Sequence, residues 1–249
     1  MCMASCHALF IFGENMRTAL FLWIGISSLF SSYTCAAISL SATRLIYGER
    51  DRDASISVIN TGEQDVMIQS WLENNDNNVL PPPFAVTPPL AKLNSKERQL
   101  LRVLFQGHGL PNDKESVFWL NVQEIPQVVN DGNILQLALL QRVKLFYRPA
   151  GLNGDANSSP QQLKVKLINN QLELHNPTSY HINMVNFKQG ESEIDMPMIG
   201  PGERVSIPVK NIVPHGFFSI ATVNDYGAIV TYKANFNQGV ASMLIVNEK

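Results

Sequence analysis

Apolar residues in this chain recur at every second position, and this alternation limits the possible folds more than any other feature. It appears at Ile56 and Val58, Val66 and Ile68, Val117 and Trp119, and Leu135, Leu137 and Leu139. Successive side chains of a strand point to opposite faces, so the pattern predicts half-buried strands. Clusters such as TGEQ, NNDNN and GHGLPND separate the runs and are typical of turns. Strands at intervals of roughly ten residues indicate immunoglobulin-like sandwiches.

A polar segment divides the alternating runs into two sets. Residues 151–160 read GLNGDANSSP, without alternation and rich in turn formers, which favours a flexible linker. We therefore predict an all-β protein with two immunoglobulin-like β-sandwich domains, over 37–149 and 161–249, joined by a linker at 150–160.

The N-terminal segment has the pattern of an export signal. Residues 19–30 read ALFLWIGISSLF and are followed by small residues at the end of the segment. The apolar run is short for a membrane span and suits a signal peptide. We predict a leader over 1–36 with cleavage after Ala36, and regard 1–15 as an extension ahead of the natural start at Met16. A retained membrane anchor is the alternative.

Cysteine content and charge exclude several classes of function. The three cysteines (Cys2, Cys6 and Cys35) all lie in the leader, so the remaining 249 − 36 = 213 residues contain none. Disulfides, thiolate metal sites and cysteine nucleophiles are thereby excluded from the mature chain. With 19 basic and 21 acidic residues the chain carries a formal charge of −2. A chain of this charge has no bulk attraction to nucleic acid.

One run is long for a strand. Residues 134–147 read ILQLALLQRVKLFY, and Leu135, Leu137 and Leu139 would share one face. Part of this strand could project beyond its own sheet, where an apolar strand needs a partner to prevent aggregation. The alternative is an ordinary core strand with its leucines packed inward.

The segment 110–126, LPNDKESVFWLNVQEIP, resembles the signature of the periplasmic pilus-assembly chaperones. Five further landmarks are similar to the family in order and spacing. They are ATRLIY at 42–47, FAVTPPLAKL at 84–93, VKLFYRP at 143–149, HNPTSY at 175–180 and VNDYG at 223–227. The resemblance covers nearly the whole mature chain.

The resemblance implies two immunoglobulin-like domains in a boomerang arrangement and a function in the periplasm. Chaperones of this family hold fimbrial subunits, including tip adhesins, until an outer-membrane usher takes them. The subunits lack their last strand, and a donated strand completes both their backbone hydrogen bonds and their core. By resemblance the donated residues are Leu135, Leu137 and Leu139. Three buried leucines would contribute roughly 5–9 kcal/mol before the ordering costs of association.

The resemblance also implies two charged sites. Arg44 and Lys144 match the pair of cations that binds the C-terminal carboxylate of the subunit and fixes the register of its strand. Glu115, Arg148 and Asp225 match an ion cluster between the domains, which would set their angle rather than add stability. The segment 127–133 between the last two strands of the first domain is short, which places the chain in the short-loop group of the family.

Enzyme motifs are missing from the sequence. It has no HExxH, GxSxG, phosphate-binding loop or dinucleotide fingerprint, so we expect no catalysis, no metal and no cofactor. Two tryptophans and five tyrosines of the mature chain leave one alternative function, a secreted two-domain β-sandwich carbohydrate-binding module. An exported hydrolase is a third hypothesis, but no carboxylate pair or triad for it is apparent.

Overall fold

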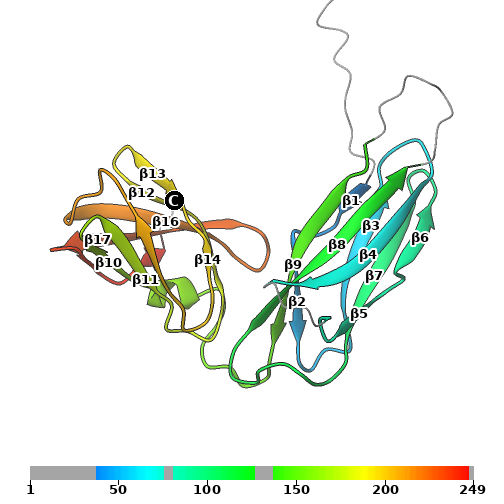
Figure 1. Ribbon diagram of the computed structural model, residues 1–249, viewed down its shortest axis with the longest axis horizontal. Helices are drawn as coiled ribbons and strands as arrows, with labels where there is room; N and C mark the ends of the chain where they lie inside the picture. Colours follow the sequence, from blue (N-terminus) through cyan, green and yellow to red (C-terminus); the bar gives the residue numbers. More distant parts are fainter. Residues whose placement is uncertain (1–37, 76–80, 127–136, 247–249) are drawn as a thin grey trace, which may run out of the picture. The chain divides into compact units, whose positions relative to one another are not determined.

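The computed structural model describes residues 38–75, 81–126 and 137–246 (Figure 1). The predicted leader and the loop at 127–133 lie outside the described residues. Nearly all regular structure in the described residues is strand, and the one helical element is the short 3-10 turn η2 (Ser159–Gln162). In the described part of the chain no helix is long and apolar enough to span a membrane. The all-β prediction is confirmed.

The first half of the chain packs two sheets face to face around one core. The smaller sheet has the order β1-β3-β7-β5 and the larger β2-β9-β8-β4-β6. All pairs are antiparallel except β2 with β9. The strands are β1 (Ile38–Leu40), β2 (Arg44–Gly48), β3 (Ala54–Asn60), β4 (Val66–Asn74), β5 (Phe84–Thr87), β6 (Leu90–Leu93), β7 (Arg98–Phe105), β8 (Ser116–Pro126) and β9 (Leu140–Arg148).

The alternation predicted the strands of this half and, with one exception, the buried face. Ile56 and Val58 of β3 are buried, as are Val66 and Ile68 of β4. In β8 the core is filled by Phe118, Leu120 and Val122, whereas Val117 and Trp119 lie half-buried on the opposite face. Both faces of this strand carry large apolar residues, so alternation alone does not say which one faces the core.

The second half encloses a separate core in strands that are linked into one sheet. The order is β13-β12-β16-β17-β18-β10-β11-β15, with β14 beside β12 and β19 beside β17. Phe187, Phe218 and Phe236 pack together in its core. The strands are β10 (Lys164–Ile168), β11 (Gln171–His175), β12 (Ile182–Gln189), β13 (Ser192–Asp195), β14 (Met198–Ile199), β15 (Arg204–Pro208), β16 (Gly216–Val223), β17 (Ile229–Asn237), β18 (Val240–Ala241) and β19 (Ile245–Val246).

The polypeptide changes sheet early in the first half. β1 pairs with β3 in the smaller sheet, and four residues later β2 pairs with β9 in the larger one. Because β2 begins only at Arg44, it covers the edge of β9 from Lys144 onward. This places Arg44 at the point where that edge becomes covered.

Candidate functional site

Two cations meet at the start of β2. Arg44 lies directly opposite Lys144 of β9, and Lys144 lies opposite Trp119 of β8. Residues in direct register on neighbouring strands project from the same face of a sheet, so the three side chains share one surface. The Lys144 ammonium is 5.6 Å from the centre of the Trp119 ring. The structure therefore brings together the two cations that the resemblance assigned to carboxylate binding.

The hydrogen bonds of both cations go to neutral groups. Burial lowers the pKa of Arg44, and the nearby charge of Asp225 partly offsets that effect. Arg44 Nη1 donates to the carbonyl of Val223 at 3.1 Å, and Lys144 Nζ donates to Asn183 Oδ1 at 2.8 Å. Within the described residues neither side chain forms a salt bridge, and Arg44 Nε has no hydrogen-bond partner. Burial lowers the pKa of Lys144, and the nearby charge of Arg44 lowers it further. Two like charges on adjacent strands destabilise the fold, and an anion would reverse that effect.

The edge of β9 ahead of these cations is open. On one side β8 pairs with β9 from Leu140 to Tyr147, whereas β2 on the other side begins opposite Lys144. Among the described residues, no strand pairs with the segment 140–143 on the β2 side. A row of unpaired backbone groups of this kind is a template for a further strand.

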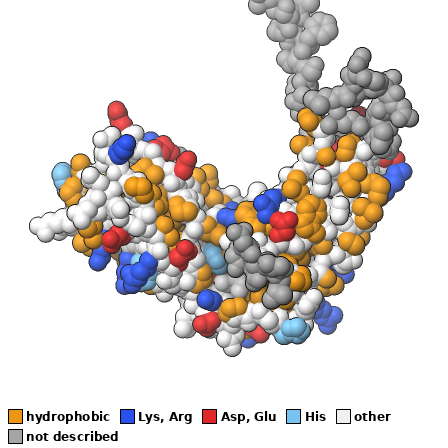
Figure 2. All heavy atoms as spheres, in the orientation of Figure 1, with side chains coloured by type: hydrophobic (Ala, Val, Ile, Leu, Met, Phe, Trp, Pro, Cys, Tyr) orange, Lys and Arg blue, Asp and Glu red, His pale blue; other side chains and the backbone are white. Residues whose placement is uncertain are grey.

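The leucines predicted to form a donated strand lie just before this edge. Leu137 is 68% exposed and Leu139 40% exposed, while Leu135 falls outside the described residues. Apolar side chains are spread over the visible surface of the first half (Figure 2). Neither Leu137 nor Leu139 is packed in the core of its own half.

The described part of the predicted strand 134–147 is strand only from Leu140 onward, and 134–136 lie outside the described residues. β9 starts at Leu140, although the carbonyl of Leu139 still accepts a hydrogen bond from the Glu124 amide. An extended continuation would place Leu137 and Leu139 on the face that buries Val143 and Leu145. Leu137 and Leu139 would thus extend the row of core-facing side chains of β9 past the end of the core of the first half.

The acidic and basic residues predicted as an ion cluster lie in direct contact. Arg148 Nε donates to Glu115 at 2.6 Å, and its two terminal nitrogens donate to the two oxygens of Asp225 at 2.6 and 2.7 Å. Such two-pronged pairs fix geometry as well as charge. Glu115 is almost fully buried. Burial disfavours the charge of Arg148, but its hydrogen bonds with Asp225 and the charge of Glu115 outweigh burial and raise its pKa.

His181 completes this cluster and was missed by the sequence reasoning. Its backbone amide donates to Glu115 Oε2 at 2.8 Å, and its ring Nδ1 lies 2.9 Å from the same oxygen. The preceding loop is held by Asn176, whose side-chain amide donates to the carbonyl of Tyr180. The landmark HNPTSY ends one residue before His181, and that adjacency was the signal available.

A tight turn presents Asp225 to Arg148. The side chain of Asn224 accepts hydrogen bonds from the amides of Tyr226 and Ala228. Gly227 has φ of +82°, and a Cβ atom there would lie 2.5 Å from the hydroxyl of Thr43. The last residue of the landmark VNDYG is thus restricted to glycine by both its backbone conformation and its closeness to the residue before Arg44.

Comparison with known proteins agrees with this geometry. Residues 37–153 match the family described as "Pili and flagellar-assembly chaperone, PapD N-terminal domain", and 158–234 match "Pili assembly chaperone PapD, C-terminal domain". The probable fimbrial chaperone LpfB of Escherichia coli O157:H7 is 35% identical over 225 residues, which cover 86% of this chain and 95% of LpfB.

Solved structures give the same result. The crystal structure of the YadV chaperone superposes with a TM-score of 0.70 at 30% identity, covering 81% of this chain and all of that one. The periplasmic chaperone SfaE gives a TM-score of 0.65 at 32% identity over 84% of this chain and 98% of its own. The chain therefore belongs to the family of pilus assembly chaperones.

Proposed function

We propose that this protein is a periplasmic chaperone that binds and caps fimbrial subunits, pilins or a tip adhesin, and delivers them to an outer-membrane usher. The observation that carries the proposal is the open edge of β9, which is preceded by exposed leucines and ends at two cations without a salt bridge among the described residues. A subunit that lacks a strand would pair with this edge and take the leucines into its own core. The relatives named as fimbrial chaperones support this function.

The direction of the bound strand follows from the position of the cations. The open part of the edge lies ahead of Lys144, and Arg44 stands where it ends. A partner strand running parallel to β9 would reach Arg44 and Lys144 with its C-terminal end. Its carboxylate would then accept the arginine fork and the lysine ammonium, which together fix its register.

The ion cluster would hold the two halves of the chain so that both contribute to the cation site. Arg148 and Lys144 lie on β9, whereas Asp225 and Asn183 belong to the second half. In this proposal the ion cluster fixes the orientation of the two halves, and it does not itself bind the subunit.

The alternative function receives no support from the tryptophans. Trp119 is covered by the guanidinium of Arg142, 4.8 Å from its ring centre, and the Trp71 indole donates to Glu73. The face of Trp119 is thus occupied by a cation, and Trp71 is half-buried. We also propose that the protein has no catalytic activity, in keeping with a family of assembly chaperones.

Capture of a subunit tests the proposal. A tagged chaperone is co-expressed with the fimbrial subunit that it serves, and the subunit that co-purifies from the periplasm is measured. We expect Arg44→Ala and Lys144→Ala each to reduce capture at least tenfold, about 1.4 kcal/mol of binding free energy. Arg98→Ala, an exposed cation elsewhere in the first half, is the matched control and should leave capture unchanged.

The leucine variant also has a control that is matched in exposure. Leu139 and Leu104 are each 40% exposed, so a glutamate at either position costs the free chaperone a similar amount. Only Leu139→Glu should abolish capture. Equal capture by both variants would refute strand donation, and glycan binding without any subunit capture would favour the carbohydrate-binding alternative.

A further inference from the structure

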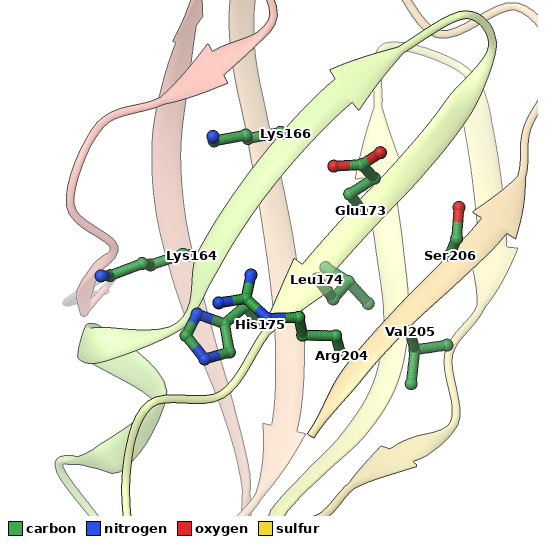
Figure 3. Close-up of a pocket in the computed structure, with 8 residues that line it drawn as sticks. All are labelled: Lys164, Lys166, Glu173, Leu174, His175, Arg204, Val205 and Ser206. Carbon is green, nitrogen blue, oxygen red and sulfur yellow. The ribbon is translucent and has the colours of Figure 1, made fainter. Parts of the chain in front are cut away.

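A cavity outside the proposed subunit site lies on the second half of the chain. Its volume is about 510 Å³, and it lies over β10, β11 and β15. Figure 3 shows its lining side chains projecting from these three adjacent strands. The polar ones among them are Lys164, Lys166, Glu173, His175, Arg204 and Ser206. None of these residues belongs to the cation pair, the donated strand or the ion cluster.

Strand register sets these residues in two rows. Lys164, His175 and Arg204 lie directly opposite one another across β10, β11 and β15. The next row on the same face holds Lys166, opposite Glu173 and Ser206. Three permanent cations and a histidine thus surround one hollow, together with a single carboxylate.

The cations of this hollow outnumber its carboxylates. Among the described residues Lys164, Lys166 and Arg204 form no salt bridge, although Glu173 lies opposite Lys166 on the neighbouring strand. The carboxylate of Glu203, next to Arg204 in sequence, accepts a hydrogen bond from the Gly200 amide at 2.6 Å and does not line the cavity. Like charges on neighbouring strands destabilise a sheet. This local excess occurs in a chain whose overall charge is −2, so general basicity does not explain it.

We propose that this cavity binds the phosphate group of a phosphate-bearing ligand. The guanidinium of Arg204 can hold two oxygens of the group, and Lys164 and Lys166 add point charges. His175 supplies a further donor on the same face, whereas the Ser206 hydroxyl already donates to Gln171 Oε1 at 2.7 Å. A phosphate has enough acceptor oxygens for this number of donors, whereas a single carboxylate has only two. The volume leaves room for more of the ligand than the phosphate alone.

The histidine provides a reporter of occupancy. Burial lowers the pKa of His175, and the charges of Arg204 and Lys164 lower it further. The groups that face it are Lys164 from β10, Arg204 from β15 and Glu173 from its own strand. A bound phosphate would offset the two cations, so the pKa of His175 should rise when the site fills.

The test uses the purified protein and inorganic pyrophosphate at low ionic strength, with His175 followed by NMR. We expect a saturable shift of its ring signals and a rise in its pKa. The double variant Lys164→Gln/Arg204→Gln should weaken binding at least tenfold. The double variant Lys210→Gln/Lys233→Gln makes the same change of charge on exposed residues of the same half, outside the cavity, and should bind as the unchanged protein does.

One further variant should strengthen pyrophosphate binding, and two outcomes would contradict the proposal. Glu173→Gln removes the one carboxylate of the hollow and should strengthen binding a few-fold. Equal weakening by the two double variants, or the absence of a saturable shift in the unchanged protein, would overturn the proposal. The thermal unfolding midpoint of Lys164→Gln/Arg204→Gln should be no lower than that of the unchanged protein, because the change removes neighbouring like charges. This result would keep loss of folding separate from loss of binding.

A second arm identifies the source of the phosphate. Sedimentation with vesicles of phosphatidylglycerol, compared with phosphatidylcholine alone, tests for a lipid headgroup. Binding to the anionic vesicles that pyrophosphate displaces and Lys164→Gln/Arg204→Gln abolishes would assign a headgroup. Pyrophosphate binding without vesicle binding would assign a soluble phosphate ligand.

Discussion

The two charged sites on β9 differ in the partners of their cations. Arg148 lies at hydrogen-bond distance from two carboxylates, Glu115 and Asp225, whereas Lys144, four residues earlier, donates to a neutral amide and lies opposite Arg44. A guanidinium held by two carboxylates fixes one arrangement of the chain by itself. Two neighbouring cations without a carboxylate at hydrogen-bond distance form an unbalanced pair, which costs stability until an anion binds. The same strand thus carries one cation held by carboxylates and one that forms no salt bridge among the described residues.

Removal of Arg148 should give the largest loss of stability. Arg148→Ala leaves the buried carboxylate of Glu115 without its guanidinium, and breaking a buried pair in this way costs about 3–5 kcal/mol. The free energy of unfolding in urea measures the effect. Arg98→Ala, on an exposed part of β7, should change it by less than about 0.5 kcal/mol. If the two variants lose the same stability, the cluster does not have the structural role assigned to it here.

A methyl group at Gly227, in the turn that presents Asp225 to Arg148, should lower the free energy of unfolding by less than the loss of Arg148 does. Gly227→Ala must adopt a positive φ and displace Thr43, and strain of this kind costs of order 1–3 kcal/mol. Gly202 also has a positive φ but no atom within 4 Å of a Cβ, so Gly202→Ala isolates the backbone contribution. A larger loss at Gly227 than at Gly202 is expected, and the reverse order would show that the closeness to Thr43 is unimportant.

The smallest expected effect is a change in the pH dependence of stability, and it comes from Lys144 in the unbalanced pair with Arg44. The pKa of Lys144 is lower in the folded chain than its ordinary value of 10.5, so between these two values the unfolded chain binds more protons. Stability contributed by this group therefore rises as the pH increases through that window. Lys144→Met should remove this rise, which urea unfolding at neutral and alkaline pH detects. An unchanged pH dependence in the variant would mean that Lys144 is not destabilised by its surroundings.

The sequence predicted the fold class because alternation and turn clusters are local signals. Val66 and Ile68 mark the inward face of β4 without knowledge of any other strand. The inward face of β8 was not predictable in this way, since Phe118 and Trp119 are both large and apolar. The short strands β14, β18 and β19 have two residues each and leave no periodic pattern to detect.

The candidate site depended on pairings that span long stretches of sequence. Arg44 and Lys144 are opposite one another although about a hundred residues separate them, and no local pattern connects them. The family motif supplied that link. The motif did not include His181 or Asn183, because each contributes through contacts whose partner lies far away in sequence.

The early change of sheet between Leu40 and Arg44 gives the binding edge a fixed length. β2 pairs with the remainder of the edge. It would therefore limit how far a strand that pairs with residues 140–143 can extend. A partner strand that is one residue too long would clash with the start of β2. A strand that is too short would leave its C-terminal carboxylate out of reach of both cations. In the proposed complex the chain would thereby set the length of its partner's strand as well as hold it.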